Sequence, residues 1–424
     1  MKLYRLIIFS FILAVLPYSL LAVENRGKAV TMEVWNAISE RNFVKDFDKK
    51  YRKKILDKYL PLAMKCKTDA EIAEVLNKMI AQIGQSHIKV FPPVGFAAMA
   101  ANKAVLQQML PPRGTPFVPA GVGVQVCRVE DSIRILYVKP GFPAAMAGIK
   151  PGDKIESING LKIVPEQSSA IPWTLLGERL LWGLPKTKVK LQLSRPGLNG
   201  GKERKLSYTL TRKANGGIWF QLGIMPRFAS LYESRILPGN IGYIRFTVFT
   251  PAMVMFVRND IMGKLKNVKG IVLDLRNNPG GIIISPQFLA GWLSPKPVYF
   301  GQLISDRNKM TFKSYPQSVG FKGKLAILIN GGSASAAEVC AAGFQDSDAA
   351  EIFGIRSSGE CLPSMFIQFP DGFRLQTVSG NLIRANGKTI EHVGVSPDVE
   401  VKQTVQGLLK GQDAVLNAAA DYVK

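Results

Sequence analysis

Residues 68–84 carry the clearest periodic pattern in the chain, with apolar side chains recurring every three or four residues. This spacing places them on one face of an α-helix, so the segment is predicted to be an amphipathic helix. Thr68 and Glu71 have the spacing of a capping box, and Gly84 suits the helix end. We expect residues 23–118 to be mostly helical, with Ser86 and His87 just past this helix. The apolar face comprises Ile72, Val75, Leu76, Met79, Ile80 and Ile83.

Residues 119–215 have a different pattern, built from short strand-like runs separated by turns. An Ala-rich segment at 143–147 predicts a short helix, and Asn159-Gly160 predicts a hairpin turn. Strand-like runs occupy 121–124 and 133–138. These features predict a small β-rich domain.

Residues 216–411 alternate between apolar strand-like runs and helical segments, which predicts a layered α/β core. Residues 412–424 are expected to form a helical tail. The predicted strands are 240–246, 270–276 and 325–330, and the predicted helices are 255–266 and one beginning near Ser335.

The first 22 residues resemble an export signal. Lys2 and Arg5 precede an apolar run, and Ala22 suits a cleavage site. We therefore expect residues 1–22 to be a signal peptide and the protein to be periplasmic or secreted. The alternative is a retained anchor, because apolar character persists to Val23.

Charge and composition narrow the function classes. The 424 residues contain 55 Lys and Arg against 31 Asp and Glu, a net charge of +24. A net positive charge of this size suits binding to an anionic membrane or envelope surface, although it also serves general solubility. No zinc finger, basic zipper or Arg-rich run organises the charge for nucleic acid, so no nucleic-acid partner is expected. Four cysteines without a CxxC pair and only two histidines predict no metal site and no cofactor.

Two segments could carry chemistry. Ser335 follows a strand and Gly-Gly at a predicted helix start, where free N–H groups and the helix dipole stabilise developing negative charge. The spacing of Ser335 and Glu338 also fits a capping box, which leaves a purely structural role open. Gly280 and Gly281 end another strand, where glycine lets the backbone approach a ligand closely.

The β-rich segment resembles a PDZ domain of the kind inserted in bacterial proteases. The resemblance rests on GVGV (121–124), PAAMAGIKPGD (143–153) and ING (158–160). It implies capture of a peptide or its C-terminal carboxylate by strand addition. The backbone of Gly121, Val122, Gly123 and Val124 would hold the carboxylate.

Three further motifs follow in order: DLRNNPGG (274–281), GGSASAAE (331–338) and GVSPDVEV (394–401). Together with the PDZ-like unit they resemble the C-terminal processing peptidases, serine proteases of family S41. The resemblance implies a core related to the crotonase fold, polypeptide substrates and PDZ-mediated recruitment or gating. It makes Ser335 the nucleophile and assigns the oxyanion hole to the Ala336 N–H with Gly280 or Gly281.

One departure from that family concerns the base. Its better-known branch uses a lysine 25 residues after the serine, and Glu360 stands there in this chain. A carboxylate cannot replace a neutral amine as the base. Ser86 and His87 resemble the pair used by the tricorn-like branch, which has a Ser-His-Ser-Glu tetrad. That resemblance implies His87 as base, Ser86 as its orienting partner and Glu360 as the support of Ser86.

Two alternatives remain open: an inactive binding or scaffold protein on the same fold, and a Ser-Lys peptidase with an unrecognised lysine base. His392 is interpreted as structural. Cys340 and Cys361 lie near the proposed catalytic residues, and a disulfide or two buried thiols would both fit. The sequence specifies neither the substrate nor the oligomeric state.

Overall fold

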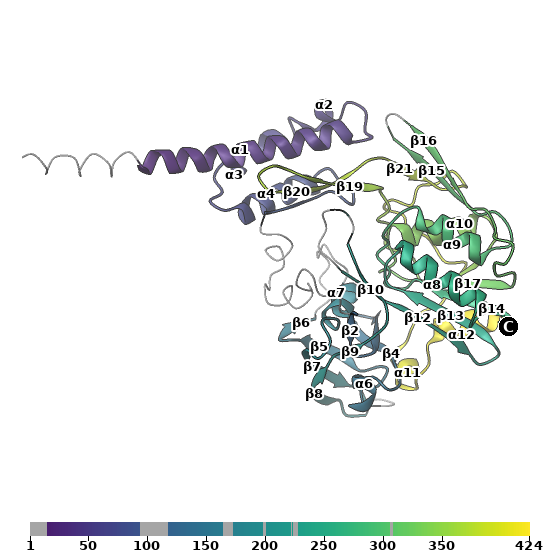
Figure 1. The fold of residues 1–424 in the computed structure, drawn as a ribbon. Helices are drawn as coiled ribbons and strands as arrows, with labels where there is room; N and C mark the ends of the chain where they lie inside the picture. Colours follow the sequence, from purple (N-terminus) through teal and green to yellow (C-terminus); the bar gives the residue numbers. More distant parts are fainter. Residues whose placement is uncertain are drawn as a thin grey trace, which may run out of the picture. The chain divides into compact units, whose positions relative to one another are not determined.

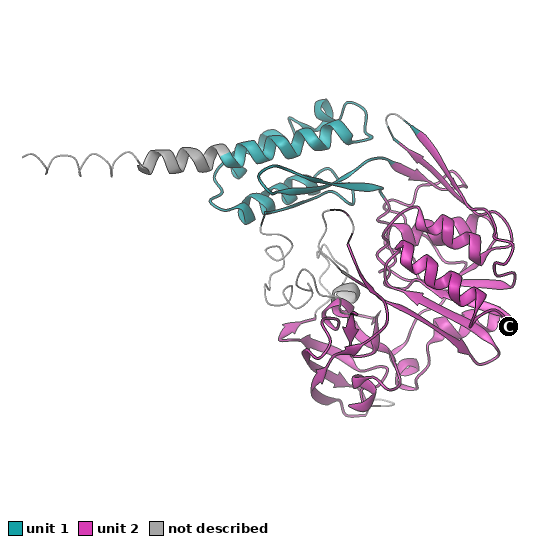
Figure 2. Ribbon diagram, viewed as in Figure 1, with its two compact units in different colours: residues 1–103, 305–308, 362–380 teal, residues 104–304, 309–361, 381–424 magenta. Residues whose placement is uncertain are grey.

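The computed structural model describes residues 15–93, 118–163, 173–197, 201–221, 223, 228–305 and 308–424, without the side chains of 15–25, 173–176 and 228. The chain forms two compact units (Figure 2). Unit 1 comprises residues 1–103, 305–308 and 362–380, and unit 2 the remainder.

Unit 1 combines helices with a three-stranded antiparallel sheet in the order β1-β20-β19. The predicted helix at 68–84 is confirmed as α4, with both halves of its capping box. Trp35, Leu76 and Phe373 are fully buried between the helices and the sheet. Pairing of β1 with β20 brings distant segments together, which local patterns did not predict. The elements are α1 (Val15–Arg41), α2 (Phe47–Tyr51), α3 (Leu56–Ala63), α4 (Asp69–Ala81), β1 (Lys89–Phe91), β19 (Ser364–Gln368) and β20 (Arg374–Val378).

Helix α1 covers part of the predicted signal segment. It runs without interruption through Ala22 to Arg41, whereas residues 1–14 lie outside the described part of the chain. Among the described helices, none is both long and apolar enough to span a membrane.

The β-rich part of unit 2 (Figure 1) contains a sheet in the order β3-β4-β5-β7-β8. Strand β3 is at the end of this order, so one of its edges is unpaired within the sheet. The predicted hairpin is confirmed, because Asn159 and Gly160 adopt positive φ between β5 and β6. The elements are β2 (Ala120–Gly121), β3 (Val124–Val129), β4 (Ser132–Val138), α6 (Pro143–Met146), β5 (Lys154–Ile158), β6 (Leu161–Lys162), α7 (Trp173–Leu180), β7 (Lys188–Arg195), β8 (Arg204–Thr211) and β9 (Lys213–Ala214).

The rest of unit 2 is the predicted layered α/β core, a mixed sheet in the order β12-β13-β14-β17-β18-β22 (Figure 1). Its strands alternate between two apolar layers: Ile271 and Leu273 join one cluster, and Val272 joins the cluster that includes α12. The bounds are β12 (Tyr232–Leu237), β13 (Ile241–Phe246), α8 (Pro251–Met262), β14 (Gly270–Asp274), α9 (Ser285–Leu293), β17 (Lys324–Ile329), α10 (Ala336–Asp346), β18 (Glu351–Gly354), β22 (Val399–Glu400), α11 (Val405–Leu409) and α12 (Ala414–Tyr422).

Short accessory sheets complete unit 2: β10 (Ile218–Phe220) with β11 (Phe228–Ser230), and β15 (Tyr299–Ile304) with β16 (Lys309–Lys313) and β21 (Asn381–Ile383). The helix predicted at 255–266 begins four residues earlier than expected. Thr250 caps it by accepting from the Met253 N–H, and Pro251 suits its first turn.

The strand order positions the functional loops. Strands β14 and β17 are parallel neighbours, so their carboxyl ends meet at one edge of the sheet. The loop after β14 carries residues 275–281, and the loop after β17 carries residues 330–335. Two of the motifs singled out by sequence therefore lie side by side.

Candidate active site

The two loops are locked together by asparagine side chains. The Asn277 N–H donates to Asn330 Oδ1 at 2.9 Å, and Asn330 Nδ2 donates to Asn277 Oδ1 at 2.9 Å. The Ala334 N–H donates to the Asn278 carbonyl at 3.0 Å. Asn277 and Asn278 are buried and Asn330 is half-buried, so these bonds are partly shielded from water and fix the spacing of the loops.

In the loop after β14, close contacts leave no room for a side chain at Gly280 or Gly281. Gly280 has φ 97° and Gly281 has φ 139°. A Cβ on Gly280 would lie 2.7 Å from Ser335 Cβ and 2.8 Å from the Ala336 nitrogen. A Cβ on Gly281 would lie 2.3 Å from the Phe249 oxygen. Gly280 therefore packs directly against the start of α10, as expected for a loop that approaches Ser335.

Backbone hydrogen bonds distinguish the two glycines as donors. The Gly280 N–H donates to Asn278 Oδ1 at 2.9 Å, and its carbonyl accepts from the Phe249 N–H at 2.8 Å. Because the peptide bond is trans, the Gly281 N–H points opposite to that carbonyl, away from Phe249. Within the described residues, the N–H groups of Gly281 and Ala336 have no acceptor. These two donors could stabilise an oxyanion.

Ser335 immediately precedes α10, as the sequence predicts. Its φ of 54° with ψ of −121° is unusual for a residue with a side chain and costs about 1–3 kcal/mol. The Ser335 N–H donates to the Glu360 carbonyl at 2.9 Å and to Glu338 Oε2 at 3.0 Å. These bonds hold the serine in its strained conformation at the positive end of the helix.

Glu338 is the functional group that sequence reasoning understated, because its spacing suggested only a helix cap. Its buried carboxylate also accepts from Ser357 Oγ at 2.6 Å, the Gly359 N–H at 2.7 Å and the Glu360 N–H at 3.1 Å. Burial raises the pKa of Glu338 to about 7, and the four donors, including the Ser335 N–H, oppose that rise. A fully buried glutamate beside the serine motif organises the whole Ser335 loop.

Ser86 and His87 lie in unit 1, between α4 and β1. Ser86 Oγ lies 2.8 Å from His87 Nδ1, so the expected side-chain contact is present. The segment is anchored at both ends, because Asn42 Nδ2 donates to Gln85 Oε1 at 2.7 Å and Asn77 exchanges two hydrogen bonds with Val90. The imidazole is thereby oriented within its own unit.

The Glu360 side chain is exposed, while its backbone joins Ser335 and Glu338. Glu360 and Ser335 belong to unit 2, whereas Ser86 and His87 belong to unit 1. The predicted bonds of Glu360 to Ser86 and of His87 to Ser335 therefore stay predictions.

The remaining residues of interest also lie in unit 2. Cys340 and Cys361 are buried free thiols whose pKa values are raised by burial, so the thiol alternative holds and the disulfide does not. The His392 N–H donates to the Gly359 carbonyl at 2.7 Å, and its imidazole is largely exposed, 3.6 Å from Glu391.

Glu338→Gln tests the electrostatics of this site. A raised pKa in the folded protein means that Glu338 contributes stability fully below its unfolded pKa, near 4.5, and loses that contribution as pH rises through about 7. The wild-type free energy of unfolding, minus that of Glu338→Gln, should therefore fall between pH 5 and pH 8. Chemical denaturation of both proteins across this range measures the difference. A difference independent of pH would contradict the assignment.

Comparison with known proteins agrees with this architecture. Residues 240–401 match the model of peptidase family S41, and residues 120–210 match that of a PDZ domain. The solved structure of the photosystem II D1 C-terminal processing protease has a TM-score of 0.54 at 23% identity, covering 92% of this chain and 98% of that one. The fold is therefore shared.

Two carboxy-terminal processing proteases are similar to this chain in sequence. A carboxy-terminal-processing protease of Bartonella bacilliformis is 28% identical over 308 residues, covering 70% of this chain and 64% of the relative. A carboxyl-terminal-processing protease of Synechocystis sp. is 24% identical over 404 residues, covering 93% of this chain and 86% of the relative. The chain thus spans just under two thirds of the first relative and most of the second. The chain therefore contains a PDZ domain and a peptidase family S41 domain that carries the paired glycine and serine loops, and its homologues are carboxy-terminal processing proteases.

Proposed function

We propose that this protein is an exported serine endopeptidase that hydrolyses polypeptides, with Ser335 as nucleophile and His87 as general base. The observation that carries the proposal is the arrangement around Ser335. The serine begins α10 in a strained conformation, Gly280 packs against it, and the N–H groups of Gly281 and Ala336 have no acceptor within the described residues.

The chemistry follows from these groups. His87 takes the hydroxyl proton as Ser335 Oγ attacks the substrate carbonyl, and the Gly281 and Ala336 N–H groups stabilise the resulting oxyanion. The imidazolium then gives that proton to the departing amine, which leaves an acyl-enzyme. Water, deprotonated by the same imidazole, hydrolyses the ester and restores the serine. Ser86 Oγ, 2.8 Å from His87 Nδ1, orients the ring, and Glu360 supports Ser86 in this proposal.

Alanine variants test this mechanism, because a serine hydroxyl is a poor nucleophile until a base takes its proton. Ser335→Ala and His87→Ala should each lose about a thousandfold or more in kcat/KM, and the double variant should lose little more. The pH profile should fall on the acid side near the pKa of a histidine, about 6.5. Peptide cleavage and thermal melting are measured for all three variants.

The matched control is His392→Ala, which removes the second of the two histidines and should keep activity. An active His87→Ala enzyme would favour a lysine base.

Glu360→Gln should fold normally but turn over more slowly, and wild-type turnover in that variant would remove Glu360 from the mechanism. A wild-type protein that binds peptides but cleaves none would support the inactive binding protein.

The PDZ domain is proposed to recruit substrates and to gate the active site. The Val126 carbonyl in the edge strand β3 accepts from Asn277 Nδ2 at 2.8 Å, and Asn277 belongs to the glycine loop of the core. A second link is the buried ion pair between Arg245 of the core and Glu178 of α7, at 2.6 Å. A peptide pairing with β3 would compete with Asn277 for the Val126 carbonyl. Peptide binding to the PDZ domain would thus change the hydrogen bonding of Asn277, which belongs to the loop beside Ser335.

Asn277→Asp tests this gating. The change replaces the donor to Val126 with an acceptor but keeps Oδ1 for Asn330. A peptide with a free C-terminus, added in trans, should change the kcat of the wild type on a short reporter substrate, and Asn277→Asp should lose most of that response. Asn330→Asp is the control, because it disturbs the same loop pair without touching Val126. A normal response in Asn277→Asp would refute the link.

Export is proposed from the first 22 residues, with their two positive charges and apolar run. The remaining positive charge would suit an anionic envelope surface. Sequencing the N-terminus of the exported protein tests cleavage after Ala22, and a protein retained in the cytoplasm would contradict export.

A further inference from the structure

Helices α8 and α9 carry large apolar side chains on their outer surface. The two helices lie side by side in the core (Figure 1). Phe288 of α9 has 59% of its surface exposed, and Met255 of α8 has 48%. Single exposed apolar residues are common on soluble proteins, but a contiguous group of them marks a binding surface. What matters is therefore whether these side chains adjoin one another.

One contact between the helices places these side chains on a common surface. The Arg258 guanidinium of α8 lies 5.5 Å from the centre of the Trp292 ring of α9. Met255 precedes Arg258 by three residues, so it lies on the same side of α8. Phe288 precedes Trp292 by four residues, and Ile284 lies one turn further back. The exposed side chains of both helices thus flank this contact.

The segment after β16 extends the same surface. The Gln317 N–H donates to the Gly291 carbonyl at 2.8 Å, so this segment lies against α9. Tyr315 and Val319, on either side of Gln317, are 70% and 61% exposed. Together the two helices and this segment form what we call the apolar face, which consists of Met255, Ile284, Phe288, Tyr315 and Val319.

Unpaired positive charges border the apolar face. Lys313 Nζ lies 5.4 Å from the centre of the Tyr315 ring. Among the described residues, no carboxylate forms an ion pair with Lys313 or Arg258. The one acidic residue of α8 is Asp260, which accepts from Tyr232 Oη at 2.5 Å and so faces β12. The cations beside the apolar face are therefore available to an anionic partner.

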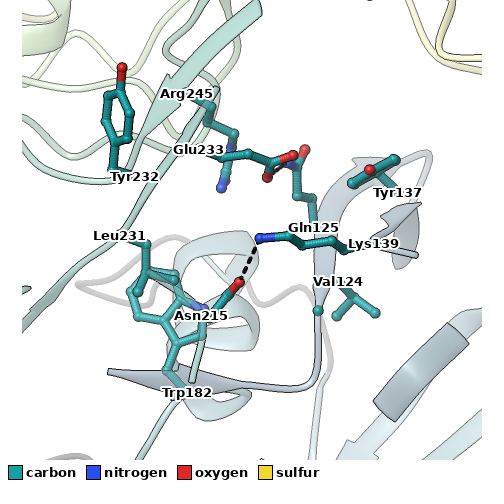
Figure 3. A pocket seen from close by; sticks show the side chains of 11 residues that line it. Val124, Gln125, Tyr137, Lys139, Trp182, Asn215, Leu231, Tyr232, Glu233 and Arg245 are labelled. Carbon is teal, nitrogen blue, oxygen red and sulfur yellow. Dashed lines mark hydrogen bonds between the residues drawn. The ribbon is translucent and has the colours of Figure 1, made fainter. Parts of the chain in front are cut away.

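The sequence keeps carboxylates out of this region. By contrast, the hollow beside β3 is lined by both signs of charge, with Glu233 as well as Lys139 and Arg245 (Figure 3). Cations around exposed aromatic and aliphatic groups complement an anionic lipid surface, where apolar groups enter the acyl boundary and cations meet headgroup phosphates. Residues 282–323 contain one acidic residue, Asp306, and the basic residues Lys296, Arg307, Lys309, Lys313 and Lys322.

We propose that the apolar face binds the surface of a membrane that contains anionic lipids. Phe288 and Tyr315 enter the boundary between headgroups and acyl chains, and Arg258 and Lys313 meet the lipid phosphates. The inference rests on the proposed affinity for an anionic envelope surface and identifies the residues that make the contact. It assigns this surface a role separate from peptide-bond cleavage.

A fluorescent label on the apolar face tests the proposal in the full chain carrying Ser335→Ala, which prevents self-digestion. The environment-sensitive fluorophore NBD is attached at Val319→Cys, where it reacts selectively because the four native cysteines are buried. Vesicles of phosphatidylcholine, alone or with an equal amount of phosphatidylglycerol, are titrated in. NBD emission should shift to shorter wavelength and intensify. The half-maximal response should need at least about tenfold less lipid with phosphatidylglycerol present, because each cation near an anionic surface strengthens binding severalfold.

Charge variants separate this surface from the net charge of the chain. Arg258→Gln with Lys313→Gln should remove most of the preference for phosphatidylglycerol. The matched control is Lys188→Gln with Lys190→Gln, which removes the same charge from exposed positions of β7 and should leave the preference unchanged. NBD at Met146→Cys, an exposed residue of the PDZ domain, should not respond to either kind of vesicle.

An apolar variant completes the test. Phe288→Gln with Tyr315→Gln should raise the lipid needed by about tenfold or more, because two rings no longer leave water. Thermal melting checks that each variant is folded. A silent label at position 319, an equal response at position 146, or an unchanged preference in the folded Arg258 and Lys313 variant overturns the inference. A response at position 319 that grows with protein concentration without vesicles would assign the surface to a second copy of the chain and also overturn it.

Failure of this inference can be told apart from failure of the peptidase proposal. Labelling of the wild type at Ser335 by a serine-reactive phosphonate and digestion of a soluble unfolded protein, both without vesicles, report on catalysis alone. Catalysis without a lipid response retains the peptidase and refutes the membrane-binding surface. A lipid response without catalysis retains the membrane-binding surface and refutes the peptidase.

Discussion

The reciprocal amide pair of Asn277 and Asn330 is the interaction on which the candidate active site depends. It joins the loops that follow two parallel strands, and all the other features of the site build on that spacing. With the loops fixed, Gly280 packs against Ser335. Because Asn277 is buried, loss of Asn330 would leave its polar groups unsatisfied away from water. The Asn277–Asn330 pair therefore helps to hold the N–H groups of Gly281 and Ala336 in fixed positions.

The carboxylate of Glu338 holds the surroundings of Ser335 in place. One buried carboxylate accepts from Ser335, Ser357, Gly359 and Glu360, so a single side chain gathers the helix start and the loop that follows β18. The strain at Ser335 persists because these bonds over-determine the conformation. Such preorganisation suits a site that must stabilise charge without rearranging.

The PDZ domain and the core meet at Asn277. Asn277 holds the Val126 carbonyl through Nδ2 while its Oδ1 accepts from Asn330. The same side chain is thus shared between the PDZ strand and the serine loop.

Local sequence determined the helix at 68–84, the glycine turn and the position of Ser335 at a helix start, because capping, periodicity and glycine conformation act within a few residues. The family motifs made Gly280 and Gly281 equivalent donors. The Gly280 N–H is taken up locally by Asn278 Oδ1, and only the tertiary contact of the Gly280 carbonyl with Phe249 directs the Gly281 N–H away from that strand. Residues distant in sequence likewise decided three further features: the burial of Glu338, the free thiols of Cys340 and Cys361, and the pairing of β1 with β20. Burial and long-range pairing depend on which surfaces meet in the fold, and no pattern within one segment encodes that.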